Sequence, residues 1–493
     1  MVASAGDPAT WIPCAVGSRS AGTRDGGRTL VGGSPPRLIY LSERARRLLG
    51  DGTLVVTDAH LATLVERLLA SGVAEPATAL MKAIPIKQVT VVIPVRDRPA
   101  SLDRLLAGLV GVKAVVVDDA SVSPRQIATV VAKHGADLVA MSTNVGPAAA
   151  RNAGLKAVRT PFVLFADSDV QIDVETISRL LTHFADPELA AVAPRVRGIK
   201  SDRSWLGRYE QDRSSLDVGR VSGLVRPGTS IGWLPSAVLA VRAGVVGTGF
   251  DESMRFGEDV DLAWRLNDGG WRVRYDATIE ARHQGLTRLD PWLIRKVGYG
   301  SSAAPLAKRH GAKVAPAGMS LGGAAIASAL LLQRRWSLPA AGLVSAIMAA
   351  RTAKALSNSD HPLRLSVELT GLGVASTAHQ VSDLMLRHWW PGSVVAAVVS
   401  SRARRTLIGA MVVHGVLDHR RSGSELSVPC HAVARTLDNI AYGTGVWMGA
   451  ARGRSVEALL PQSVTAVRKA TRRRADDPPS SWGGVLHGGV VDQ

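Results

Sequence analysis

Cysteine and aromatic residues are scarce in this sequence, and no secretory signal is recognisable at its start. The 493 residues include only two cysteines, Cys14 and Cys430, which lie far apart in segments expected to be loop or tail. This excludes a disulfide framework and a cysteine-based metal site. The first residues show no basic start followed by an apolar core and a cleavage site. We therefore expect the protein to act in the cytoplasm or at the cytoplasmic face of the cell membrane.

Acidic residues are also few compared with basic ones. The sequence has 59 Lys and Arg against 41 Asp and Glu, a formal net charge of +18. A charge of this sign suits anionic partners such as nucleic acids, nucleotide sugars or acidic membrane surfaces. With 49 glycines, 4% aromatic residues and a bias toward Ala, Val and Arg, however, the composition is typical of GC-rich coding, which raises the arginine content without any function. We therefore expect no nucleic-acid partner.

A small module is expected after an N-terminal tail. Residues 1–28 are rich in Gly, Ser, Pro and Arg without apolar periodicity, which indicates a disordered tail. Within residues 29–80, apolar segments at 28–31 and 36–41 are expected to pair as a hairpin, and helices follow, one of them capped by Asp58. This pattern resembles the PqqD-like winged-helix modules that bind precursor peptides in ribosomal-peptide pathways. A packing appendage of the next domain is the alternative.

The next part of the chain alternates apolar strands with amphipathic helices. Strands are expected at Val89–Val95, Ala114–Asp118, Leu138–Met141 and Phe162–Ala166, and helices at 101–110, 124–134, 147–158 and 174–184. Such alternation predicts an α/β fold with a doubly wound, mostly parallel sheet. In sheets of this kind ligands bind beyond the carboxyl ends of the strands.

Polar residues follow all four expected strands at that edge. They lie in Ile93–Asp97, Asp118–Ser121, Asn144–Asn152 and Asp167–Asp169. The last segment is Asp-Ser-Asp, and residues i and i+2 of a strand point to the same side. The two carboxylates can therefore hold one divalent cation, which takes oxygen ligands and leaves positions for phosphate and water.

These motifs resemble the nucleotide-binding half of the family 2 glycosyltransferases, which have a GT-A (Rossmann-like) fold. The family pattern runs Val-Ile-Pro-x-Tyr-Asn, Asp-Asp-x-Ser, Asn-x-Gly-x-x-x-Ala-Arg-Asn and Asp-x-Asp. Residues 249–266 match its second half, Gly-Phe-Asp-Glu followed by Glu-Asp-x-x-Leu. The resemblance implies a GT-A domain over residues 86–290 and an inverting, metal-dependent hexosyltransferase with a UDP-sugar donor.

The resemblance also implies roles for residues in the donor motifs. Asp119 would accept a hydrogen bond from the uracil N3–H, with Asp118 as the second choice. Asn144 belongs to the same nucleotide-sugar site. Arg151 is placed to meet the nucleotide, because a guanidinium suits phosphate better than a lysine does. Asp167 would reach the ribose as well as the metal.

The first donor motif departs from the family pattern. Pro94 is kept, but Arg96 and Asp97 stand where the family usually has Tyr-Asn. We still expect these three residues at the nucleotide-sugar site. Stacking of the base on an aromatic ring must then become stacking on a guanidinium or be lost.

The expected cofactor is Mg²⁺ or Mn²⁺ bridging the diphosphate. By the resemblance, Asp167 and Asp169 are its ligands. His283 lies where related enzymes often carry a histidine that reaches the metal or the diphosphate. A purely structural role for His283 is the alternative.

The acceptor side is expected around the Glu-Asp motif. Asp259 lies three residues before Leu262, so both point to the same side of a helix. By resemblance Asp259 is the general base that deprotonates the acceptor hydroxyl, and Glu258 contacts the acceptor or the donor sugar. The neighbouring acids are interpreted as ordinary surface charge, namely Asp251, Glu252, Asp261 and Asp268.

A helical region is expected over residues 291–465, followed by a disordered tail over 466–493. Val314–Leu332 is an uncharged run of about the length needed for a bilayer span, but it is rich in Gly and Ala. We expect a membrane-associated region with at most one or two spans. Buried helices of a soluble domain and interfacial helices with basic flanks are the alternatives.

Within family 2, the small module, the hairpin loop and the Arg-rich block after Gly257 resemble the mycofactocin-system glycosyltransferases of mycobacteria and relatives. That resemblance implies transfer of glucose, as β-1,4-linked chains, to the redox cofactor mycofactocin or its precursor. One alternative is a family 2 enzyme with a lipid-linked or cell-envelope polysaccharide acceptor. The other is a non-catalytic protein that binds a peptide through residues 29–77.

Overall fold

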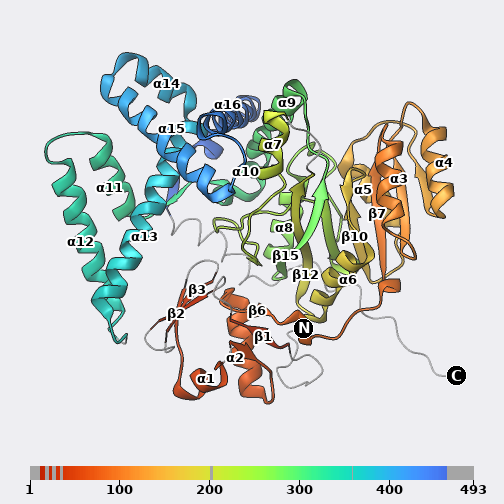
Figure 1. Cartoon of the computed structure of the whole chain (residues 1–493), viewed down its shortest axis with the longest axis horizontal. Helices are drawn as coiled ribbons and strands as arrows, with labels where there is room; N and C mark the ends of the chain where they lie inside the picture. The colour runs from red at the N-terminus through yellow and green to blue at the C-terminus, as the bar shows by residue number, and fades with distance from the viewer. Residues whose placement is uncertain are drawn as a thin grey trace.

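The structure is a computed structural model that describes residues 12–16, 21–24, 29–33, 37–50, 52–199, 204–357 and 359–463. Three parts follow one another along the chain (Figure 1). A small module of strands and two helices comes first, an α/β domain with one large sheet is next, and a helical region completes the described chain.

The N-terminal module contains two small sheets and two helices. Its elements are β1 (Cys14–Ala15), β2 (Ala21–Arg24), β3 (Thr29–Gly32), β4 (Arg37–Tyr40), α1 (Glu43–Leu48), β5 (Thr53–Leu54), α2 (Ala59–Ser71) and β6 (Glu75–Pro76). The predicted hairpin is confirmed, because β3 and β4 pair antiparallel. The second helix is also confirmed: the Asp58 side chain accepts from the backbone N–H of Leu61 at 2.8 Å, and Gly72 ends the helix in the left-handed conformation.

The prediction that residues 1–28 form a disordered tail is wrong for two segments, which are strands β1 and β2. Strand β1 lies between β5 and β6, and β2 pairs with β3. Cys14 is fully buried in the module's own core, with Leu54, Val65 and Leu68. These strands are too short to show alternation in the sequence, so only their tertiary partners reveal them. Residues 1–11, 17–20 and 25–28 lie outside the described ranges.

The α/β domain is built on a nine-stranded sheet in the order β11-β15-β12-β14-β10-β7-β8-β9, with β13 beside β15. Its strands are β7 (Val89–Val95), β8 (Lys113–Asp118), β9 (Asp137–Ala140), β10 (Phe162–Ala166), β11 (Val170–Gln171), β12 (Leu189–Gly198), β13 (Gly223–Leu224), β14 (Val238–Arg242) and β15 (Arg272–His283). Its helices are α3 (Pro99–Ala107), α4 (Pro124–His134), α5 (Pro147–Ala157), α6 (Val174–Thr182), α7 (Trp205–Asp212) and α8 (Glu258–Asp268).

The predicted alternation of strands and helices is confirmed for the first half of this domain. Strand β7 pairs in parallel with both β10 and β8, and β8 pairs in parallel with β9. Their residues alternate between two cores: Val91 and Ile93 face α3, α4 and α6, whereas Val92 faces α5 and α8. Strands β7, β8 and β10 are largely buried and read as continuous apolar runs, which is why the sequence revealed them, whereas β9 is an exposed edge strand.

The second half is mixed rather than mostly parallel, which corrects the sheet type expected from the sequence. Strand β14 runs antiparallel to both β10 and β12. A parallel neighbour needs a crossover that returns the chain to the opposite edge. Much of the chain between β12 and β14 instead lines the cavity at the carboxyl edge, including Arg213, Arg226 and Trp233. Strand β14 therefore enters the sheet from that edge.

The C-terminal region is helical. Its elements are α9 (Leu289–Ser301), α10 (Ala303–His310), β16 (Gly318–Met319), α11 (Leu321–Leu331), α12 (Ser337–Ala355), α13 (Pro362–Asp383), a π-helical turn at Leu384–His388, α14 (Trp390–Val399), α15 (Ser401–Ser422), α16 (Val428–Gly453) and β17 (Gln462–Ser463). Figure 1 shows α9 and α16 beside the α/β domain, whereas α11 to α14 extend away from the sheet. Within the described residues, no helix has both the length and the apolar character to cross a bilayer, so the spans that the sequence allowed are not found there.

Candidate active site

A cavity of about 2140 Å³ opens at the carboxyl edge of the sheet. Strands β7, β8 and β10 are parallel, so their ends meet at this edge together with the residues that follow them. Most of the residues predicted from the sequence line the cavity, namely Pro94, Arg96, Asp119, Asn144, Arg151, Asp167, Asp169, Glu258, Asp259 and His283.

Asp119 is fixed by the loop that precedes α5. Its two carboxylate oxygens accept from the side-chain amide of Asn144 at 2.8 Å and from the backbone N–H groups of Val145 at 2.8 Å and Gly146 at 3.0 Å. A carboxylate has about four acceptor positions. Three are used here, so one remains for a donor such as a base N–H.

Asp97 and Asp118 are not brought to the cavity, unlike the other predicted donor-site residues. The Asp118 carboxylate accepts from the backbone N–H of Ser121 at 3.0 Å and from its hydroxyl at 2.5 Å. Asp97 has a left-handed backbone with φ of 56°, and its carboxylate accepts from the backbone N–H of Val122 at 2.6 Å. Both carboxylates thus hold the turns after β7 and β8, which places their neighbours Arg96 and Asp119 at the site.

The structure brings Asp169 and His283 together but leaves Asp167 apart from them. The register of β11 with β15 sets His283 opposite Val170, and its Nε2 lies 3.3 Å from the Asp169 carboxylate. Arg98 also forms an ion pair with Asp169. Burial would raise the pKa of Asp169, but His283 and Arg98 hold it well below its usual range, so the carboxylate is ionised.

These residues fit a divalent cation. The ionised Asp169 carboxylate and the His283 Nε2 form a ligand pair on one wall of the cavity, and Asp167 lines the same cavity. One oxygen of Asp167 is bonded to Arg151 at 2.6 Å, and within the described part of the chain the other oxygen accepts no hydrogen bond, so it is available. Oxygen-rich ligands with one imidazole suit Mg²⁺ or Mn²⁺. The Arg98 guanidinium that pairs with Asp169 is partly exposed, so a divalent cation bound to Asp169 would displace it toward solvent.

Arg151 connects Asp167, which follows β10, to Glu258 at the start of α8. The guanidinium donates to Asp167 at 2.6 Å and to Glu258 at 2.9 Å, and it is almost completely buried. Burial would lower the pKa of Arg151, but the two carboxylates raise it above its usual value, which keeps the side chain charged. Sequence reasoning predicted a contact with the nucleotide and did not foresee this bridge.

Glu258 and Asp259 begin helix α8. The Asp259 carboxylate accepts from the backbone N–H groups of Val260 at 2.8 Å and Ser236 at 3.2 Å. Burial raises the pKa of Asp259, and Arg151 only partly offsets this. Burial, together with the neighbouring Asp259 charge, also raises the pKa of Glu258 to about 7. The helix start thus carries two carboxyl groups whose affinity for a proton is increased, which suits acid–base chemistry near neutral pH.

Asn152 joins the donor motif to the acceptor motif. Its side chain accepts from the backbone N–H of Phe250 at 2.8 Å and donates to the Phe250 carbonyl at 2.8 Å. A side chain at Gly249 would overlap with Asn152, and its φ of 80° also favours glycine. The Gly-Phe-Asp-Glu segment is therefore shaped by the end of the Asn-x-Gly-x-x-x-Ala-Arg-Asn motif.

Two of the acids interpreted as surface charge are not on the surface. Asp261 is completely buried and is bonded to Arg265 at 2.8 Å and His310 at 2.8 Å. Asp268 forms an ion pair with Lys313. The sequence could not reveal this, because His310 and Lys313 belong to the C-terminal region, which folds back over α8.

The C-terminal region supplies cavity residues that sequence reasoning missed. They lie on α9, α13, α16 and the π-helical turn, and include Arg295, Lys296, Tyr299, Gln380, Arg387, His388, Arg435 and Tyr442. The helical region 291–465 was expected to be membrane-associated, so its polar residues were not considered as site residues. Their local signal is weak, because charged and aromatic side chains are spread over helices far apart in sequence.

Comparisons with known proteins identify the family of the chain. The family model described as Glycosyl transferase family 2 matches residues 90–231. The "Pre-mycofactocin glycosyltransferase" of two strains of Mycobacterium tuberculosis is 39% identical over 447 residues, which cover 88% of this chain and 94% of that protein. The "Poly-beta-1,6-N-acetyl-D-glucosamine synthase" of Staphylococcus aureus is 24% identical over 144 residues, or 28% of this chain and 34% of that protein.

Among solved structures, the mannosyltransferase PcManGT from Pyrobaculum calidifontis, in complex with GDP-Man and Mn²⁺, matches with a TM-score of 0.35 and 17% identity. The match covers 61% of this chain and 90% of that chain. The sequence relatives carry the assignment, since one of them matches nearly from end to end. The chain belongs to glycosyl transferase family 2, and it is similar over most of its length to the mycobacterial pre-mycofactocin glycosyltransferase.

Proposed function

We propose that this chain transfers a hexose from a UDP-sugar, with glucose as the expected sugar, onto a mycofactocin precursor with inversion at the anomeric carbon. The observation that carries the proposal is the bridge made by the buried Arg151, which pairs with Asp167 of the donor side and with Glu258 of the acceptor side, beside Asp259. The acceptor is proposed from the relative that is 39% identical over 94% of its own length.

Asp259 acts as the general base in the proposed reaction. Its carboxylate takes the proton from the acceptor hydroxyl while that oxygen attacks the anomeric carbon. The bond from this carbon to the diphosphate breaks, and UDP leaves with the electron pair. A single displacement converts an α-linked donor into a β-glycoside. The raised pKa of Asp259 supports the assignment, because a base works best when its pKa approaches the working pH.

The donor nucleotide and the metal are proposed to occupy the strand ends. Asp119 has one acceptor position left for the uracil N3–H, and Arg96 offers a guanidinium where the family has a ring. Asp167, Asp169 and His283 would hold Mg²⁺ or Mn²⁺, which supplies positive charge to the leaving diphosphate. Chelation should abolish transfer, and either metal should restore it. Full activity in a chelator would contradict this role.

Product analysis tests the proposed function. The purified protein is incubated with a mycofactocin precursor and, separately, with UDP-glucose, UDP-N-acetylglucosamine or GDP-mannose, and the products are analysed by mass spectrometry. We expect hexose addition from UDP-glucose, and NMR coupling constants that show a β-linkage. An α-linked product would exclude the single displacement, and transfer only to lipid-linked or polysaccharide acceptors would exclude the proposed acceptor.

The N-terminal module is proposed to take part in acceptor binding. Glu66 and Ala70 of α2 line the same cavity as Asp259. The module is held there by an ion pair between Glu66 and Arg272 and by a hydrogen bond from Arg226 to the Ala70 carbonyl at 2.7 Å. A PqqD-like role in binding a peptide or a peptide-derived acceptor agrees with this position.

Helices α11 to α15 are proposed to bind an anionic membrane surface. Large apolar side chains are exposed on them, for example Leu321, Leu338, Leu363, Val398 and Val399. Exposed arginines flank them at Arg334, Arg335, Arg402, Arg404 and Arg405. Gln333 donates to the Arg402 carbonyl at 3.1 Å, which brings the two arginine groups together. Apolar side chains with a basic border are typical of interfacial binding to acidic lipids.

Vesicle flotation tests this surface. The protein should float with vesicles that contain phosphatidylglycerol and remain behind with phosphatidylcholine alone. Replacing Arg334 and Arg335 by glutamate should weaken the binding, whereas the same change at Arg288, an exposed residue on α9's N-terminal side, should not. Equal binding of both vesicle types, or none, would contradict the proposal.

A further inference from the structure

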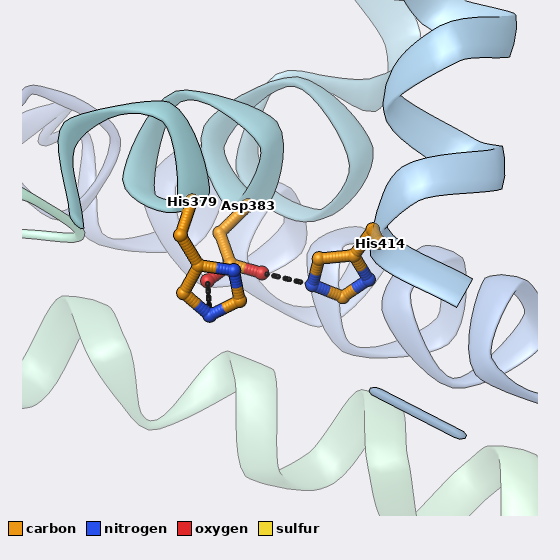
Figure 2. A group of neighbouring side chains, drawn as sticks. All are labelled: His379, Asp383 and His414. Carbon is orange, nitrogen blue, oxygen red and sulfur yellow. Dashed lines mark hydrogen bonds and ion pairs between the residues drawn. The ribbon is translucent and has the colours of Figure 1, made fainter. Parts of the chain in front are cut away.

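Two histidines and an aspartate from the C-terminal helices meet away from the Asp-x-Asp motif. His379 and Asp383 lie one turn apart on α13, and His414 comes from α15 (Figure 2). The Nε2 of His414 lies 3.0 Å from one Asp383 oxygen, and the Nε2 of His379 lies 3.5 Å from the other. Figure 2 shows both rings pointing toward the carboxylate between them.

The three side chains are spaced as metal ligands. Their ligand atoms all lie within 4.8 Å of one another, and among the described residues no other group of three His, Cys, Asp or Glu meets this criterion. The two rings are stacked, with centroids 5.3 Å apart and planes 13° from parallel. A helix places residues i and i+4 on the same face, so α13 supplies two ligands and α15 closes the site with the third.

The charge of the cluster favours a cation. Burial would raise the pKa of Asp383, but His414, His379 and Arg435 lower it to about 2, so the carboxylate is ionised. Arg435 is the nearby positive charge that opposes a cation. It is itself close to Asp418 at 3.8 Å and Asp438 at 3.6 Å, which offset its charge.

The ligand set selects the class of metal. Two imidazoles with one carboxylate suit Zn²⁺ and neighbouring transition metals, whereas Mg²⁺ prefers oxygen ligands and water. Three protein ligands also leave one tetrahedral position unfilled. His379 and Asp383 line the cavity that contains Asp259, so that position borders the cavity.

We propose that His379, Asp383 and His414 bind one Zn²⁺ ion, at a site separate from the one formed by Asp167, Asp169 and His283. The ion connects α13 to α15 and offers its fourth position to water or to an oxygen or nitrogen atom of a molecule in the cavity. Both histidines bind through Nε2 in the neutral form. The proton that His414 shares with Asp383 is then displaced to Nδ1 or to solvent.

Metal titration of the full-length protein tests this site. The protein is stripped with a chelator, returned to a buffer with saturating Mg²⁺ to occupy the Asp-x-Asp site, and titrated with Zn²⁺ against a chromophoric chelator. We expect one tightly bound Zn²⁺ per chain. The His414→Ala and Asp383→Asn variants should bind it at least roughly 10–100-fold more weakly, since losing even an outer partner of a ligand has this effect.

The control is His361→Ala. His361 is an exposed histidine directly before α13, so its removal should leave the affinity unchanged. Circular dichroism of each variant checks that it is folded. If His379→Ala is folded and binds Zn²⁺ as tightly as the parent, the proposal is wrong.

Cobalt substitution provides a measurement that does not depend on removing side chains. Co²⁺ bound to these three ligands and one further ligand should give the intense visible absorption of a four-coordinate site. This absorption should be lost on addition of Zn²⁺ and should be absent in Asp383→Asn. The weak absorption of six-coordinate Co²⁺ alone, in the parent protein, would overturn the proposal.

Discussion

At the scale of single residues, Asp259 is the decisive side chain. Asp259→Asn keeps the size of the side chain and can accept one of the two backbone hydrogen bonds, from Val260 or Ser236, but it cannot take a proton. We expect transfer to fall by roughly 10²–10⁴, the usual effect of losing a general base. Affinity for the UDP-sugar, measured by calorimetry, should be preserved, because Asp259 lies on the acceptor side. Asp290→Asn, at an exposed carboxylate that pairs with Arg288, is the matched control and should transfer at the parental rate.

The raised pKa values at the start of α8 predict the pH dependence of transfer. A carboxyl group acts as a base only when ionised, and a raised pKa moves the loss of the ionised form toward neutral pH. Burial and Asp259 raise the pKa of Glu258 to about 7, and burial raises that of Asp259. We expect kcat/KM to fall as the pH drops on the acid side, beginning at a higher pH than for a solvent-exposed aspartate, and to level off on the alkaline side. A profile that is flat from pH 5 to 8 would contradict a carboxylate base in this environment.

The sequence predicted the residues of the site better than their contacts. Asp119, Asp169 and Asp259 lie on the cavity because strand ends and a helix start place them there. Asp97 was misjudged, because its bond to the Val122 backbone forms only after two loops meet. Asp261 was misjudged for the same reason, since its partner His310 is distant in sequence. A motif indicates where in the fold the backbone of a residue lies. The tertiary contacts determine whether its side chain faces the cavity or bonds to another part of the protein.

At the scale of elements, close packing of α9 on α16 shapes one wall of the cavity. A side chain at Gly300 would overlap with the backbone of Tyr442, one at Gly445 would overlap with that of Val297, and one at Gly449 would lie 2.7 Å from the Ser301 oxygen. Glycines thus allow the two backbones to touch. Because α9 carries Arg295 and Tyr299 into the cavity, this contact also positions site residues.

Gly300→Ala should therefore be destabilising. A methyl group forced into this contact moves the two helices apart, and overpacking of this kind costs about 1–3 kcal/mol. Chemical denaturation measures the change in the free energy of unfolding. The control is Gly342→Ala in α12, where an added methyl meets nothing within 4 Å and the helix should be stabilised by about 0.5–1 kcal/mol. Equal stability of both variants would show that the α9–α16 contact is looser than the structure indicates.

The elements themselves were predictable only where local patterns dictate them. The ends of β7 and β10 were predicted correctly, because both are continuous apolar runs next to turn residues. The direction of β14 was not predicted. It depends on whether the chain before β14 stays at the carboxyl edge of the sheet or crosses to the opposite edge. The α9–α16 contact was missed too. Small residues on a helix indicate close approach only once the partner helix is known.

At the scale of the whole molecule, all three parts of the chain enclose one cavity. Glu66 comes from the N-terminal module, Asp169 and Asp259 from the α/β domain, and Tyr442 from the C-terminal helices. The sequence indicated three parts but treated the outer two as additions to an independent catalytic domain. Their convergence on the cavity depends on long-range ion pairs such as Arg272 with Glu66, which have no local signature.

Deletion of the N-terminal module separates its contribution from catalysis. The module has its own core, and without it Arg272 keeps its partners Asp186 at 2.9 Å and Glu188 at 3.2 Å. Buried Arg274 loses the nearby charge of Glu75 but keeps those of Asp186 and Asp276. A chain that begins at Lys82 should therefore fold, which a thermal melt can verify. No donor-site or base residue is removed, so hydrolysis of the UDP-sugar should continue at the parental rate.

In transfer assays, the truncated chain should differ from the parent in its KM for the acceptor. Removing Glu66 and Ala70 opens one wall of the cavity, and we expect the acceptor KM to rise while the KM for the UDP-sugar stays the same. Glu66→Arg in the full-length protein provides an independent check, because it sets two positive charges against each other at Arg272 and should raise the acceptor KM in the same direction. An unchanged acceptor KM in the folded truncation would mean that the module only packs against the domain. Loss of UDP-sugar binding would instead mean that it supports the donor site.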